Sequence, residues 1–183
     1  MAGSGTMTAL PPGVRIRPAT QADAAAGAAL HRACWQEAYA PYADPGRLTE
    51  ATADEADWES RWRQQLAAGP PRQLAVHEGH GLVGFGVTGP CRDPDLAHAD
   101  ELYALYVRQA WWGSGLGQAL LDAVLGANAC SLWVLEDNAR ARRFYERNGF
   151  VTDGSRELYE RLGTWEVRLV RSALSTVVLF SNS

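Results

Sequence analysis

Trp112-Gly113-Ser114-Gly115-Leu116-Gly117 is the stretch of sequence that decides the fold. It follows an apolar run at 101–107 and opens a segment whose apolar residues recur at helical spacing as far as 127. The predicted order is strand, glycine loop, helix. Glycine lets the backbone come close to an anion because it has no Cβ and adopts positive φ at little cost. The free N–H groups and the dipole at a helix start then favour a phosphate. By itself the loop is a weak indication, since its spacing fits neither of the two common glycine-rich phosphate motifs.

A second informative stretch lies one predicted strand later. Residues 132–135 read Leu-Trp-Val-Leu, and residues 138–150 read Asn-Ala-Arg-Ala-Arg-Arg-Phe-Tyr-Glu-Arg-Asn-Gly-Phe. With both stretches in view, the chain resembles the GNAT superfamily of acetyl-CoA-dependent N-acyltransferases over residues 14–171. That family's loop reads Gln/Arg-x-x-Gly-x-Gly/Ala, from which this chain departs at Trp112. The family's second block, Asn-x-x-Ala-x-x-Phe-Tyr-x-x-x-Gly-Phe, is matched at every fixed position.

Apolar periodicity along the chain predicts a single α/β domain. One helix is expected to end near Pro41, and a second is expected to start at a capping box formed by Thr52 and Glu55. The element order β-α-α-β-β-β-α-β-α-β-β predicts a mixed sheet with helices on both faces. The resemblance implies the same: a central, mostly antiparallel sheet of about six to seven strands. Strands are expected at 14–17, 73–77, 82–87, 101–107, 131–135 and 164–170, with helices at 116–127 and 138–148.

Composition narrows the function classes. A chain of 183 residues suits one domain, and its net charge of −4 argues against general nucleic-acid binding. The three scattered cysteines form no C-x-x-C pair, and the histidines show no metal spacing, so neither a disulfide framework nor a metal site is predicted. No apolar run approaches the length of a membrane span. We therefore expect a cytoplasmic protein with a disordered leader at 1–13, a domain at 14–171 and a tail at 172–183.

The resemblance makes acetyl-CoA the co-substrate and places its pyrophosphate on the glycine loop. Backbone N–H groups are expected to do the binding, so the side chain at Trp112 matters little, although it removes one possible contact. The expected residues are Trp112, Gly113, Ser114, Gly115, Leu116, Gly117 and Gln118.

The pantetheine arm of acetyl-CoA is expected along the preceding strand. Main-chain groups of Leu105, Tyr106 and Val107 would bind it as an added strand does. In the family, the strand at 101–107 splays from the strand at 131–135 to make the slot. Asn138 is expected to cap the next helix or to contact pantetheine, and the two roles are compatible.

A basic cluster begins the second block of the family. Arg140, Arg142 and Arg143 are either a solvated helix face or a contact for the 3′-phosphate of CoA. Under the second interpretation, Arg142 is the expected ligand.

Two residues are candidates for the acid–base chemistry of amine acetylation. Tyr145 matches the tyrosine that sits over the CoA sulfur in the family. Its ordinary pKa of about 10 suits it to protonate a leaving thiolate. The alternative is a core aromatic beside Phe144.

Glu101 is the candidate base. It lies fourteen positions before Gly115, the offset of the glutamate base in the histone-acetylating branch of the family. An exposed glutamate is too acidic to deprotonate an ammonium, so it would need partial burial or an ordered water. It could also be a solvated residue at a strand end; the alternative bases are Asp100, Glu136 and His98.

The leading hypothesis is an N-acetyltransferase that acts on a small primary amine in a ternary complex. A protein N-terminal or lysine acetyltransferase is the second hypothesis, and an acetyl-CoA sensor without turnover is the third. A cationic acceptor is expected from the acidic residues Glu50, Asp54, Glu55, Asp57 and Glu59, which could equally be a solvated helix start. The apolar tail at 174–180 is expected to be ordered as an added strand or in a homodimer, the alternative being a frayed terminus.

Overall fold

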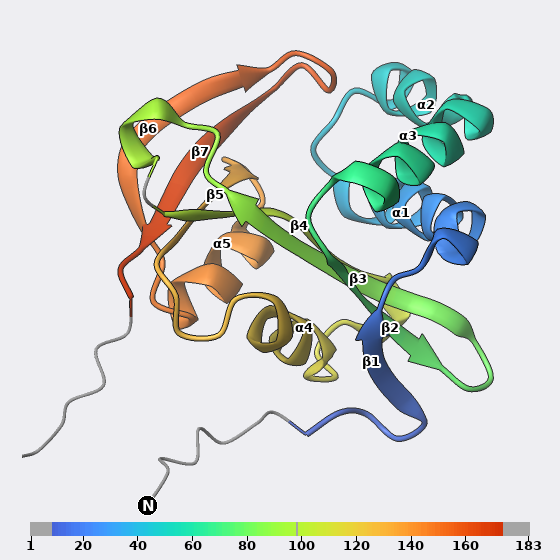
Figure 1. Ribbon diagram of the computed structural model, residues 1–183. Coiled ribbons are helices and arrows are strands. Elements are labelled where there is room, and N and C mark those ends of the chain that lie inside the picture. The colour runs from blue at the N-terminus through green and yellow to red at the C-terminus, as the bar shows by residue number, and fades with distance from the viewer. Residues whose placement is uncertain (1–8, 98, 174–183) are drawn as a thin grey trace, which may run out of the picture.

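A seven-stranded, mostly antiparallel sheet forms the centre of the molecule, which we describe from a computed structural model covering residues 9–97 and 99–173 (Figure 1). The strand order is β1-β2-β3-β4-β5-β7-β6. The strands are β1 (Val14–Pro18), β2 (Arg72–His77), β3 (Gly81–Pro90), β4 (Asp100–Val107), β5 (Cys130–Leu135), β6 (Val151–Tyr159) and β7 (Thr164–Arg171). The helices are α1 (Ala24–Tyr39), α2 (Pro45–Ala53), α3 (Glu55–Ala68), α4 (Leu116–Val124) and α5 (Ala139–Arg147).

Helices cover both faces of this sheet, as the sequence predicts. In Figure 1, α1, α2 and α3 gather on one side of it, whereas α4 and α5 lie on the other. A core cluster joins α1 and α3 to β2 and β3, and a second joins α4 and α5 to β4, β5 and β7. No helix among the described residues is long and apolar enough to cross a membrane.

The contact between β4 and β5 is the one parallel junction in the described sheet, and it is short. Only Asp100 pairs with Cys130 and Glu101 with Ser131. Beyond those pairs, β4 continues against β3 and β5 continues against β7, both antiparallel. The two strands therefore diverge toward their carboxyl ends, as the family resemblance implied and the sequence alone did not show.

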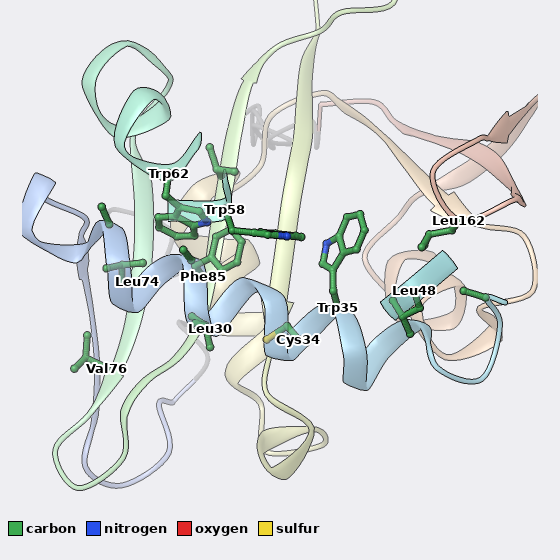
Figure 2. Packing of buried hydrophobic residues seen from close by; sticks show 14 residues of the cluster. Leu30, Cys34, Trp35, Leu48, Trp58, Trp62, Leu74, Val76, Phe85 and Leu162 are labelled. Carbon is green, nitrogen blue, oxygen red and sulfur yellow. The ribbon is translucent and has the colours of Figure 1, made fainter. Parts of the chain in front are cut away.

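Aromatic rings fill the space between α1, α3 and the sheet. Trp62 is almost fully buried, and Trp58 lies between Trp62 and Trp35 over α1 (Figure 2). The indole of Trp62 donates a hydrogen bond to Nδ1 of His31 at 3.3 Å. Burial lowers the pKa of His31 to about 3, helped by the charges of Arg72 and Arg161, so this ring is neutral at physiological pH.

Several element boundaries differ from those predicted. The segment before Thr52 forms α2, which the sequence analysis did not predict, and Thr52 itself lies within that helix. The cap of α3 is Asp54, whose side chain accepts from the Asp57 amide at 2.9 Å, so the capping-box prediction at Thr52 was wrong. The helix predicted to run to 127 ends at Val124. The predictions for most of the leader, for His98 and for the tail at 174–183 lie outside the described residues.

Replacing Gly27 with Ala should destabilise the protein. A Cβ at Gly27 would lie 2.3 Å from the ring of Trp62. Overpacking a core costs about 1–3 kcal/mol, and an approach this close to a buried ring belongs to the upper part of that range, about 2–3 kcal/mol. The gain in helix propensity offsets about 1 kcal/mol of this cost. Urea denaturation should show a free energy of unfolding lower by about 1–2 kcal/mol. Gly79→Ala, in an open turn, is the control and should change it by under about 0.5 kcal/mol. Equal stability of Gly27→Ala and the parent protein would contradict this packing.

Candidate active site

The diverging strands β4 and β5 enclose a cavity with a volume of about 550 Å³. The glycine loop and the start of α4 line one end of it, and residues from α1 line the other. Side chains from both faces of the sheet contribute: Leu102 and Leu105 belong to the α4 side, whereas Tyr103 and Tyr106 pack on the α1 side. The cavity therefore passes through the sheet and could admit two substrates from opposite faces.

The glycine loop has the geometry of an anion-binding helix start. Gly113 and Gly115 adopt φ values of 78° and 88°, which favour glycine. The Ser114 hydroxyl donates to the carbonyl of Trp111 at 2.7 Å and accepts from the Leu116 amide at 3.3 Å. The backbone ladder of α4 begins with the Ala119 amide bonded to the Gly115 carbonyl. The amides of Gly117 and Gln118 precede that ladder, and both residues line the cavity.

Trp112 is held at the edge of the loop by two contacts. Its indole nitrogen donates to the carbonyl of Val107 at 2.8 Å, which occupies one main-chain group expected to bind pantetheine. The guanidinium of Arg140 lies 3.6 Å from the centre of the indole ring and also lines the cavity. Arg140 thus brings a positive charge next to the position where the family motif has Gln or Arg.

The other arginines of the cluster lie apart from the cavity lining. Arg142 donates to the carbonyl of Glu136 at 3.1 Å. Arg143 is exposed on α5. Neither is among the residues that line the cavity, so the structure brings Arg140 to the loop rather than Arg142.

Two amide side chains form hydrogen bonds at the ends of α4 and α5 next to the cavity. Asn138 is buried, and its Oδ1 accepts from the Ala141 amide at 3.0 Å, which is the expected cap of α5. Asn138 also lines the cavity, so it can cap α5 and contact the cofactor at the same time. Gln118 donates to Asn148 at 2.7 Å and to Asp122 at 2.9 Å, which ties α4 to the end of α5.

Tyr145 lines the cavity from the α5 side. Its ring packs edge-on against Phe144 and Phe150, with centroids 5.2 and 5.6 Å away. Burial raises the pKa of its phenol well above the ordinary value. Its hydroxyl makes no hydrogen bond to another described residue. The phenol therefore remains protonated and can donate to a group in the cavity.

Glu101 lies at the closed end of the strand pair and outside the cavity lining. It is only 2% exposed, and its carboxylate accepts from the Arg92 amide and from Nε of Arg92, both at 3.0 Å, and also from a terminal nitrogen of Arg92. The structure does not bring Glu101 together with Tyr145. Among the alternative bases, Glu136 bonds to Arg156 and Asp100 is half-buried.

Aromatic residues that the sequence analysis missed line the α1 end of the cavity. They include Tyr39, Tyr103 and Trp133. The hydroxyls of Tyr39 and Tyr106 are hydrogen-bonded at 2.6 Å, which links α1 to β4. The register of β3 and β4 shifts between Val87 and Thr88, and this irregularity leaves Tyr103 without a partner in the ladder. Alternation in the sequence gave no indication of the bulge.

The loop between β3 and β4 is clamped over this end of the site. Arg168, on β7, is 7% exposed and contacts Asp93, Asp95 and Asp153 at 2.6–3.1 Å. The indole of Trp133 donates to Asp93 at 3.1 Å. These contacts fix the backbone next to Arg92, which in turn holds Glu101.

Comparison with known proteins agrees with this geometry. A model of the acetyltransferase (GNAT) domain matches residues 70–152. A probable N-acetyltransferase of Mycobacterium tuberculosis is 31% identical over 173 residues, covering 89% of this chain and 97% of the relative. A mycothiol acetyltransferase of Streptomyces scabiei is 34% identical over 122 residues, which are 63% of this chain but only 37% of that enzyme.

Solved structures share the fold at lower identity. The PaiA N-acetyltransferase of Thermoplasma acidophilum, in complex with coenzyme A, superposes with a TM-score of 0.63 at 17% identity and covers 87% of this chain and 98% of its own. A putative acetyltransferase of Salmonella typhimurium with acetyl-CoA superposes with a TM-score of 0.64 at 17% identity, and the match covers 92% of this chain and 99% of that protein. With a relative that is 31% identical and matched over nearly its whole length, and with a matching domain model, the chain belongs to the GNAT family of acetyltransferases.

Proposed function

We propose that this chain transfers the acetyl group of acetyl-CoA to a primary amine by direct attack in a ternary complex. The observation that carries the proposal is the cavity through the sheet, which has an anion-binding loop at one end and an aromatic pocket at the other. The fold neighbours that contain coenzyme A or acetyl-CoA support the choice of donor. The N-acetyltransferase names of the sequence relatives support the choice of reaction.

In this proposal the donor enters from the α4 side. The amides of Gly117 and Gln118 bind the pyrophosphate, and the positive charge of Arg140 lies beside them. The pantetheine arm extends between β4 and β5 and contacts main-chain groups near Leu105 and the side chain of Asn138. Its thioester then reaches Tyr145, which also lines the cavity.

The chemistry requires one proton to be removed and one to be supplied. The amine nitrogen attacks the thioester carbonyl carbon, a C–N bond forms, and the C–S bond breaks as the thiolate leaves. Tyr145 donates its phenolic proton to that sulfur and regains a proton from the nitrogen of the new amide. A phenol is roughly matched to a thiol in acidity, which favours this transfer.

Glu101 is the base expected from the family offset, and it would have to act through water. It is buried on the α1 side and its oxygens are engaged by Arg92. A cationic acceptor is less strongly supported by the acidic residues of α3 than the sequence suggested. Asp57 pairs with Arg61 at 2.8 Å and Glu59 pairs with Arg63, which favours a solvated, charge-paired helix start.

Acetyl-CoA and CoA should raise the melting temperature of the protein, because ligands that bind the native state stabilise it by mass action. Gly115→Asp should abolish the shift, since the side chain adds bulk, strains a φ of 88° and repels the pyrophosphate. Gly79→Asp, in an exposed turn, is the matched control and should retain it. No shift with either ligand in the parent protein would remove the central claim. A shift without thiol release across a panel of amines and peptides would instead favour the sensor.

Tyr145→Phe should lower turnover by about 10²-fold while leaving acetyl-CoA affinity nearly unchanged. The substitution deletes only the hydroxyl and leaves the packing against Phe144 and Phe150 in place. Single-turnover kinetics, which isolate the chemical step, provide the measurement. An unchanged chemical rate would reduce Tyr145 to a packing residue.

Glu101→Gln should slow acetylation, with partial recovery at high pH as free amine accumulates, if Glu101 removes the proton. Arg92 would also lose its charged partner, so the melting temperature must be recorded alongside the pH profile. A pH–rate profile with the same shape as that of the parent protein would mean that the base lies elsewhere.

A further inference from the structure

A second carboxylate faces the α1 side of the sheet, close to the aromatic end of the cavity. Glu166 lies on β7 and pairs in register with Leu135 of β5. Leu135 lines the cavity, whereas Glu166 is itself outside the lining, one strand away from it. Its neighbour Val167 packs into the core on the α5 side. Because side chains alternate along a strand, Glu166 points to the opposite face, toward α1.

Glu166 forms no ion pair or hydrogen bond with its side chain in the described part of the chain, and the charge of Arg92 acts on it only at longer range. The ion pairs and hydrogen bonds of residues 9–97 and 99–173 include none to its carboxylate, although the residue is only partly exposed. Glu101 is the opposite case, since Arg92 occupies its oxygens. An unpaired, partly desolvated carboxylate is costly unless a ligand completes it.

The charged and titratable groups around Glu166 come from several elements. Glu157 of β6 lies directly opposite it in the sheet. Arg92, from the β3–β4 loop, is near enough to interact with Glu166. The charge of Glu166 in turn helps to raise the pKa values of Tyr39 on α1 and Tyr159 on β6. Burial and the charge of Glu157 together raise the pKa of Glu166 to about 7, with Arg92 acting in the opposite direction. Such a group is half ionised near neutral pH, where a general base is most effective.

The surrounding rings suit an organic cation. Tyr39, Tyr103 and Trp133 line this end of the cavity. Arg92 already lies 4.6 Å from the ring centre of Tyr103 and Arg168 lies 5.8 Å from that of Trp133, so Tyr39 is the ring of the three that remains for a ligand cation. Aromatic faces attract ammonium groups, and apolar walls accommodate the carbon skeleton that carries them.

Resting on the proposed acetyl transfer, we infer that Glu166 binds the ammonium group of a cationic acceptor and removes its proton. The proton moves from nitrogen to the carboxylate, which leaves a neutral amine with a lone pair for attack on the thioester. The carboxylic acid then releases the proton to solvent after the product leaves. Glu101, tied to Arg92, keeps the β3–β4 loop in place.

Two isomeric amines test this assignment. Benzylamine is an ammonium at neutral pH and needs a base, whereas p-toluidine, of the same composition, is already neutral. Thiol release from acetyl-CoA should show that Glu166→Gln lowers kcat/KM for benzylamine by about 10²-fold at pH 7. The loss should shrink as pH rises, and the value for p-toluidine should change by less than about twofold. Glu78→Gln, in the remote β2–β3 turn, is the matched control and should leave both unchanged.

A second variant reports on the environment of the carboxylate. Glu157→Gln removes the opposing charge, so the acidic limb of the benzylamine profile should move to lower pH while its plateau remains. The melting temperature gives an acceptor-independent readout. A pKa raised in the folded state adds stability that is present below about 4.5 and is lost as pH rises through about 7. The parent protein should therefore lose stability relative to Glu166→Gln across that window.

The outcomes separate the two proposals. Equal losses for both amines in Glu166→Gln, or no loss for benzylamine, would overturn the role of Glu166 while acetyl-CoA binding and transfer remain. Absence of thiol release by the parent protein with both of these amines and with the whole panel of amines and peptides would contradict the proposed function as well, whatever the thermal shift. A stability difference that does not vary between pH 4.5 and 7 would show that Glu166 is not the free carboxylate described.

Discussion

Two residue pairs hold the halves of the sheet together, and the rest of the site depends on how few they are. Asp100 with Cys130 and Glu101 with Ser131 close the junction of β4 and β5. Every further pair would lengthen the ladder at the expense of the cavity. The strand edges exposed beyond the junction are covered by α4 and α5 on one side and by the aromatic cluster on the other. Backbone N–H and C=O groups that would otherwise pair with a neighbouring strand are thus left free to bind a ligand in the interior of the protein.

Burial acts differently on the acidic groups around this opening. The phenol of Tyr145 is kept protonated because its anion would be desolvated. Glu101 is also buried, but Arg92 compensates its charge with a set of hydrogen bonds. Glu166 is partly buried beside the charge of Glu157, and the charge of Arg92 compensates only part of that effect. The same physical effect therefore accompanies a phenol that stays protonated, an ion pair between Glu101 and Arg92, and a carboxyl group whose pKa is raised to about 7.

Much of the fold was predictable because the apolar periodicity of each segment indicates its secondary structure, and the order of the segments indicates the fold class. Apolar periodicity located the six expected strands and the helices after the glycine loop and after Asn138. The helix α2 escaped prediction because it begins at Pro45 and Gly46 and has few apolar residues, features that read as a loop. The end of α4 was placed too late because Ala127 continues the apolar pattern while Gly126 adopts a φ of 55°.

The site was less predictable because it is made by contacts between distant segments. The loop and Tyr145 could be found from local motifs, since each motif lies on one element. The contact of Arg140 with Trp112 joins α5 to the loop, and the pairing of Glu101 with Arg92 depends on the path of the β3–β4 loop. Glu166 stands in an ordinary alternating strand, where nothing local distinguishes it from a solvated residue. Only the strand order places it beside the cavity.

The stacking of Arg140 on Trp112 has a consequence for how a charged ligand would be received. An arginine paired with a carboxylate is held in place but has its charge neutralised, whereas one resting on an indole is ordered while its charge remains available. Much of the rotamer entropy of that long side chain is lost when the protein folds rather than when a ligand arrives. Where the family motif has Gln or Arg, this loop therefore has an indole that orders a cation supplied by α5.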